Sequence, residues 1–168
     1  VEEFRNEDVG LVVKSNIAKN CLMDRNRLYN DLKAFLRQLG DRQCKVYLLH
    51  GDMTDAEMHS LYKHSKIDAF VCLPHGEGFG LPLFEAAYSG LPVVTVGWSG
   101  QMDFLVDTEG KEQFYNVAFD LQPVQKEVHW EGVIVPNSMW AYAREGSAKE
   151  QMRLCYENVK AGNVTSDN

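Results

Sequence analysis

The hydrophobic pattern of this chain alternates between short apolar runs and stretches with helical spacing. Four apolar runs predict buried strands, at residues 9–14, 45–50, 68–73 and 91–96. Helical spacing follows the first run, at Leu28, Leu32, Phe35, Leu36 and Leu39. Strands that are apolar along their whole length and separated by helices are typical of a parallel sheet covered on both faces. The sequence therefore predicts an α/β fold, a Rossmann-like doubly wound parallel sheet.

Polar residues and glycines predict where the helices begin and end. Asp24 is expected to cap the first helix and Gly40 to end it. Residues 54–57 and 147–150 are capping boxes, in which the hydroxyl of the first residue accepts a hydrogen bond from the amide of the fourth. Each capping box predicts the start of a helix. A short helix is expected over residues 81–89.

The pattern weakens after residue 100. One more strand is expected at residues 114–121, followed by a loop over 122–137, and the final helix should end at Gly162. We found no internal repeat. We expect residues 1–162 to form one domain and residues 163–168 a disordered tail.

Composition excludes several classes of protein. The chain has 17 Lys and Arg against 24 Asp and Glu, a net charge of −7, and an acidic domain without a basic stripe is a poor nucleic-acid binder. No apolar stretch approaches the ~18 residues that a membrane helix needs. The four cysteines form no C-x-x-C pair and favour a reduced, cytoplasmic protein. The five histidines form no metal-binding motif, so no metal is expected.

A glycine-rich segment follows the third predicted strand, at the end of a parallel strand where α/β proteins bind ligands. Gly76, Gly78 and Gly80 allow its backbone to approach a ligand closely. Pro82 fits the first turn of the following helix, since its missing N–H is not needed there. The free amides of that turn form an anion site suited to a phosphate or diphosphate.

Two carboxylates flank this loop, Glu77 within it and Glu85 about one turn into the helix. Carboxylates accept hydrogen bonds from paired sugar hydroxyls, which gives them a role beside a phosphate site. The same two residues are explained equally well without a ligand, with Glu77 as a solvated loop residue and Glu85 as a partner of the helix dipole. A nicotinamide or flavin site is excluded, because Leu81 or Leu83 stands where the third small residue is required.

Residues 51–62 and 77–94 resemble the C-terminal domain of retaining glycosyltransferases of family four, also called group 1. Glu77 and Glu85 match the Glu-x7-Glu motif of that family, and residues 99–103 resemble the small-residue loop that follows the next strand. The resemblance implies the C-terminal half of a GT-B fold. It also implies that the first strand of that half is missing here.

The resemblance implies a nucleotide-sugar donor site. Glu77 would be the catalytic residue that contacts hydroxyls of the donor sugar, and Glu85 would hold the ribose hydroxyls. The other implied donor-binding residues are Gly51, Met53, Gly78, Phe79, Gly80, Leu81, Ser99, Gly100 and Gln101. Two further candidates are Lys14 and His75, for which a surface lysine and an exposed loop histidine are the alternatives.

The implied reaction transfers a sugar from a UDP-, GDP- or ADP-linked donor to an unidentified acceptor, with retention and without a metal or cofactor. The N-terminal acceptor domain would be missing, so we expect a truncated chain with little activity alone. Two alternatives stay open: a GT-B-fold nucleotide-sugar epimerase, or a non-catalytic nucleotide-binding or assembly module in a homo-oligomer. The complete enzyme is expected in the cytoplasm, either free or peripheral to a membrane.

Overall fold

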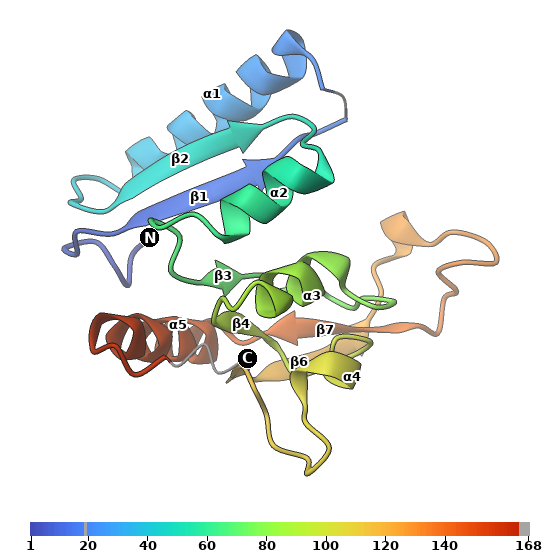
Figure 1. Cartoon of the computed structure of the whole chain (residues 1–168). Helices are drawn as coiled ribbons and strands as arrows, with labels where there is room; N and C mark the ends of the chain where they lie inside the picture. The colour runs from blue at the N-terminus through green and yellow to red at the C-terminus, as the bar shows by residue number, and fades with distance from the viewer. Residues whose placement is uncertain (19, 165–168) are drawn as a thin grey trace. The chain divides into compact units, whose positions relative to one another are not determined.

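The computed structural model describes residues 1–18 and 20–164, so most of the predicted disordered tail lies outside the described residues. The chain divides into two compact units, Val1–Glu57 and Met58–Asn168. Both units combine parallel strands with helices, which confirms the α/β fold (Figure 1). Three expectations stay predictions: a single domain over residues 1–162, the doubly wound order of the sheet and the missing first strand. No described helix is long and apolar enough to cross a membrane.

The first unit is a two-stranded parallel sheet with one long helix (Figure 1). β1 (Gly10–Ser15) pairs with β2 (Lys45–His50) along the full length of both strands, and α1 (Leu22–Gln38) connects them. These strands confirm the first two predicted ones. Gly40 follows α1 with a φ of +70°, a left-handed conformation that ends helices, as predicted.

The helix starts in the first unit confirm one prediction and correct another. The capping box of α2 (Asp55–Tyr62) is present, because the Glu57 amide donates to Thr54 Oγ1 at 3.3 Å and the Thr54 amide donates to the Glu57 carboxylate at 2.7 Å. Asp24 does not cap α1, since Cys21 is the N-cap residue. Asp24 lies in the first turn of the helix, where its carboxylate bonds a histidine and two loop amides.

The second unit contains a three-stranded parallel sheet in the order β3-β4-β5. β3 (Phe70–Val71) and β4 (Val93–Val96) confirm the predicted strands but are shorter. β5 (Tyr115–Val117) pairs with the other side of β4. β4 is therefore the central strand, and all four of its residues are buried.

Two core clusters lie against opposite faces of β4, because neighbouring residues of a strand point to opposite sides. Val93 packs with buried residues of α3 (Leu81–Tyr88) in one cluster. Val94 packs with buried residues of α5 (Glu145–Lys160) in the other. These helices fix the sheet from both sides and thereby fix the loops that leave its strands.

The strand predicted over residues 114–121 is wrong as one element. It is two strands, β5 and β6 (Phe119–Pro123), which belong to different sheets. β6 pairs antiparallel with β7 (Met139–Ala143), which was not predicted. The connection between them, predicted as a loop, contains the 3-10 helix η1 (Lys126–Val128). We call residues 119–143 the β6–β7 arm (Figure 1).

The second predicted capping box is wrong. α5 begins at Glu145 with Arg144 as the N-cap residue, so Ser147 lies inside the helix. The Ser147 hydroxyl instead accepts a hydrogen bond from the Ala118 amide at 2.9 Å and ties α5 to the chain between β5 and β6. Gly162, with a φ of +68°, follows the end of α5 as predicted.

Candidate functional site

The glycine-rich loop connects the carboxyl end of β3 to α3 in the second unit. It ends at Gly80, the N-cap residue of α3, whose φ of +88° favours glycine. Pro82 lies in the first turn of α3, as predicted. The amides of a first helical turn have no partners within the helix, so the backbone at Leu81 presents N–H groups and the positive end of the helix dipole. Such an end binds anions.

A second loop, between β4 and α4 (Met102–Leu105), holds the backbone of Glu77. Ser99 Oγ donates to the Glu77 carbonyl oxygen at 2.6 Å and accepts from the Glu77 amide at 3.2 Å. The Gly100 amide donates to the same carbonyl oxygen at 3.0 Å. The structure therefore brings together three residues that the sequence placed in the candidate site from separate loops.

The two loops touch so closely that position 100 requires a glycine. A Cβ atom on Gly100 would lie 2.1 Å from the Gly78 carbonyl oxygen. A Cβ atom on Gly78 would meet nothing within 4 Å, so that position faces open space. Gln101 is fully buried behind the contact and donates from Nε2 to the Val96 carbonyl oxygen at 3.1 Å. Gln101 is therefore a support for the loop rather than a surface residue.

Each candidate carboxylate has a weak acid near it. Glu77 is half-buried, and burial, together with the Glu77 charge, raises the pKa of the Cys72 thiol. Glu85 is exposed on α3. Burial raises the pKa of Tyr62 to about 12, and the Glu85 carboxylate adds to that shift. Both neighbours stay protonated at neutral pH and add no charge to the site.

Aromatic rings surround the loop. Phe79 packs against Phe84 and Phe104, with ring centroids 5.4 and 5.0 Å away. His75 contacts Trp140 and Tyr142 of β7. Sequence reasoning missed these last two residues because it assigned no strand to β7. The alternation of large and small residues in Met-Trp-Ala-Tyr-Ala was the signal that could have found them.

The remaining candidate residues belong to the first unit. Gly51 is buried just after β2 with a φ of +105°, and Met53 is half-buried. Lys14 Nζ donates to the Gly51 carbonyl oxygen at 3.2 Å. Next to them, His50 Nε2 lies 2.9 Å from the Asp24 carboxylate. The carboxyl ends of β1 and β2 thus carry a hydrogen-bonded polar cluster.

The described residues, 1–18 and 20–164, contain no cluster with the donor set of a metal site, since no group of three or more His, Cys, Asp or Glu side chains among them could hold a metal ion. The four cysteines are free.

Comparisons with known proteins identify a family. No curated protein sequence matches the chain. A chain in the crystal structure of the GtfA/B complex is similar, with 17% identity and a TM-score of 0.40 over 96% of this chain. The match covers 34% of that longer chain. The family model for glycosyl transferases group 1 matches residues 27–116, more than half of the chain. The chain therefore belongs to the glycosyl transferases group 1 family.

Proposed function

We propose that this chain is the donor-binding part of a retaining glycosyltransferase with a GT-B fold. Its donor is a sugar linked to a nucleoside diphosphate, UDP, GDP or ADP, and it passes that sugar to an acceptor bound by a part of the enzyme outside this chain. One observation carries the proposal: Glu77 lies in the loop just before the N-terminus of α3 and Glu85 lies within that helix, both in the segment that matches the family.

The backbone at the start of α3 suits the diphosphate. As the sugar leaves, negative charge develops on the diphosphate, and fixed N–H groups stabilise it without reorganising. The amides of Phe79, Gly80 and Leu81 supply those groups in the proposal. Ser99 and Gly100 would lie next to the phosphates, and the buried Gln101 would hold their loop in place. No metal or cofactor is required in this arrangement.

The two carboxylates bind hydroxyl groups. Glu85 is exposed on α3, and its carboxylate oxygens can accept hydrogen bonds from both ribose hydroxyls. Glu77 is held by its backbone, so its carboxylate can be kept in one place against hydroxyls of the transferred sugar. The open space beside Gly78 leaves room for that sugar.

Other parts of the proposal rest on the family resemblance. Gly51 and Met53 would flank the base, and Lys14 is a candidate for phosphate contact. The hydrogen bond from Lys14 Nζ to Gly51 supports a role in shaping that part of the first unit instead. The complete enzyme would work in the cytoplasm or at a membrane surface, and this chain would have little activity alone.

A calorimetric titration tests the proposal. The wild-type chain is titrated with UDP, GDP, ADP and their glucose or mannose conjugates, beside Glu85→Gln and the control Glu157→Gln, an exposed residue on α5. We expect one nucleotide to bind, about tenfold more weakly to Glu85→Gln, because hydrogen bonds to a charged group are lost. The control should bind like the wild type. The proposal would be refuted if the folded chain binds none of these ligands, or if Glu85→Gln binds the nucleotide as tightly as the wild type does.

Product analysis separates transfer from epimerisation. The complete enzyme is incubated with a nucleotide-sugar and an extract that supplies acceptors. Transfer of the sugar should release the free nucleotide. A nucleotide-sugar converted to its epimer, with no free nucleotide, would instead support the epimerase.

A further inference from the structure

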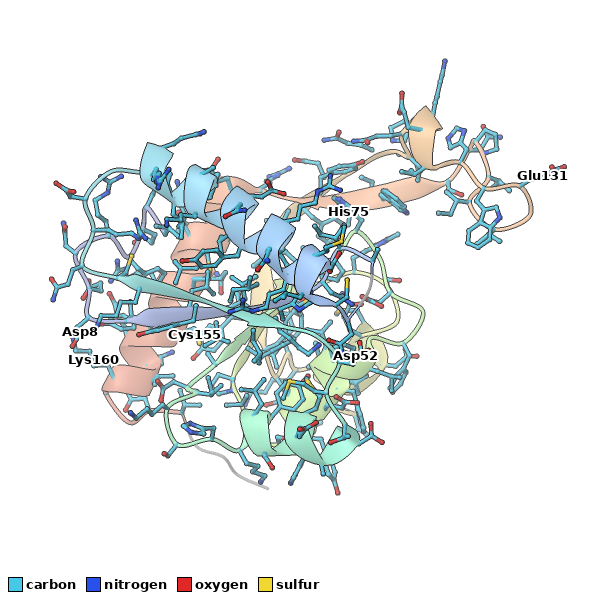
Figure 2. The ribbon with its side chains drawn as sticks, turned by 90° about the horizontal axis from the view of Figure 1, so that it is seen from above. Asp8, Asp52, His75, Glu131, Cys155 and Lys160 are labelled. Atoms are coloured by element: carbon cyan, nitrogen blue, oxygen red, sulfur yellow. The ribbon has the colours of Figure 1, made fainter. Side chains whose placement is uncertain are left out.

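His75, at the start of the glycine-rich loop, is held by contacts that diphosphate binding does not require. Its ring stacks on Trp140, with centroids 5.2 Å apart and planes within 6°, and lies 4.4 Å from the Tyr142 ring. Residues two apart on a strand share a face, so both aromatic rings reach His75 from the same side of β7. His75 lies beside the base of the β6–β7 arm, and Glu131 marks the far end of that arm (Figure 2).

Two hydrogen bonds join His75 to one residue of β7. The Ala141 amide donates to the His75 carbonyl oxygen at 2.9 Å, and His75 Nδ1 lies 2.8 Å from the Ala141 carbonyl oxygen. A carbonyl oxygen can only accept, so Nδ1 must carry a proton. In the neutral ring, Nε2 then has the lone pair and is a hydrogen-bond acceptor. Nε2 has no hydrogen bond to any residue within the described part of the chain.

The free nitrogen belongs to an exposed side chain beside the candidate donor site. His75 is exposed, and Glu77 follows two residues later in the same loop. A Cβ atom on the intervening Gly76 would lie 3.8 Å from Ser99 Oγ, the group that holds the Glu77 backbone. The two aromatic contacts fix the orientation of this exposed ring, and the bond to Ala141 fixes its tautomer. Nε2 is therefore a preorganised acceptor, because little conformational freedom remains to be lost on binding.

We propose that His75 Nε2 accepts a hydrogen bond from a hydroxyl group of the transferred sugar, which makes His75 a specificity-determining residue. The β6–β7 arm is then the element that holds the ring. This inference rests on the proposed function, and it names the sugar, rather than the nucleotide, as the part of the donor that His75 recognises.

Two variants separate the ring nitrogens. In His75→Asn, the side-chain amide can still donate to the Ala141 carbonyl oxygen, but nothing replaces Nε2. In His75→Gln, the longer amide reaches the Nε2 position and gives up the bond to Ala141. Each variant is titrated with the nucleoside diphosphate that the wild type binds and with the corresponding nucleotide-sugar.

We expect His75→Asn to bind the bare nucleotide within about twofold of the wild type and the nucleotide-sugar about three- to tenfold more weakly, the loss of one hydrogen bond. His75→Gln should recover part of the sugar-dependent affinity. Equal losses for both ligands would show that His75 only supports the loop, and no loss for either would also overturn the inference.

Nitrogen NMR gives an independent reading. The Nε2 resonance of His75 should shift when the nucleotide-sugar binds and stay unchanged with the bare nucleotide. A resonance that responds identically to both ligands would overturn the inference while leaving the proposed function standing. A wild-type chain that is folded but binds neither ligand would refute the proposed function itself.

Discussion

Ser99 holds Glu77 through both main-chain groups of that residue: its hydroxyl donates to the Glu77 carbonyl oxygen at 2.6 Å and accepts from the Glu77 amide at 3.2 Å. Ser99 also has a φ of +78°, and no other described residue besides glycine has a positive φ. A left-handed backbone costs a non-glycine residue about 1 kcal/mol or more and persists only where other contacts enforce it. The bonds to Glu77 are such contacts.

Two substitutions at Ser99 should differ in stability. Ser99→Ala removes the hydrogen bonds and keeps a Cβ atom in the left-handed conformation, so we expect a loss of about 1 kcal/mol. Ser99→Gly removes the same bonds but relieves the strain, and should be the more stable of the two. Urea unfolding measures both. An alanine variant as stable as the glycine variant would show that the backbone at this position is not strained.

Gly100 and Gly78 provide a matched pair. Gly100→Ala places a Cβ atom 2.1 Å from the Gly78 carbonyl oxygen, so one loop must move. We expect it to destabilise the fold by about 1–3 kcal/mol, as overpacking does. Gly78→Ala meets nothing within 4 Å and should change stability by less than about 0.5 kcal/mol. Thermal unfolding of both variants tests this, and equal melting temperatures would contradict the close approach of the two loops.

Stability in acid should depend on Asp24. The bond to His50 and the bonds from the Ile17 and Ala18 amides hold the pKa of Asp24 below its ordinary value of 3.8. Because the folded-state pKa is the lower one, the unfolded chain binds the proton more readily. The stabilisation is therefore present above about pH 4 and is lost as the pH falls through the folded-state pKa.

Asp24→Asn should remove this dependence. Urea midpoints measured between pH 7 and pH 3 should fall less steeply below pH 4 for Asp24→Asn than for the wild type. Asp31→Asn is the control, since Asp31 is exposed on the same helix and the structure describes no hydrogen bond of its side chain. If both variants keep the wild-type slope, Asp24 does not contribute to acid unfolding.

Much of the fold was predictable because it depends on local periodicity. β2 follows from an apolar run, and α3 follows from a proline in its first turn. The glycines after α1 and α5 end those helices. β7 has a weaker local signal, an alternation of large and small residues over five positions, and its partner β6 lies on the other side of an irregular connection. Ser147 fits a capping box, but its hydroxyl is used by the Ala118 amide, a tertiary contact that no local pattern contains.

The candidate site likewise combines residues that are close together in the chain with contacts between distant residues. Glycines and two carboxylates at fixed spacing were visible in the sequence, because ligand binding at a helix N-terminus uses residues close together in the chain. The support for Glu77 comes from Ser99, 22 positions away, and that for His75 comes from Trp140 and Tyr142, more than 60 positions away. Only the folded chain shows these pairs.

Tyr62 should limit stability in alkali. Its side chain is buried, its ring packs edge-on against Phe70, and its hydroxyl makes no hydrogen bond of ordinary geometry to the described residues. Burial, with a further contribution from Glu85, raises the pKa of Tyr62 to about 12, whereas an unfolded tyrosine ionises near pH 10. The folded state therefore loses stability as the pH rises from about 10 to about 12, because only the unfolded chain releases the proton.

Tyr62→Phe keeps the ring and removes the proton, so its urea midpoint should stay more constant over that alkaline range. At neutral pH the variant should match or slightly exceed the wild type in stability, since the buried hydroxyl that it removes has no hydrogen bond of ordinary geometry to the described residues. Tyr88→Phe is the control, because Tyr88 is 74% exposed and its substitution leaves the Tyr62 hydroxyl in place. A Tyr62→Phe chain that loses stability in alkali as steeply as the Tyr88→Phe chain would show that the Tyr62 hydroxyl ionises equally well in the folded state.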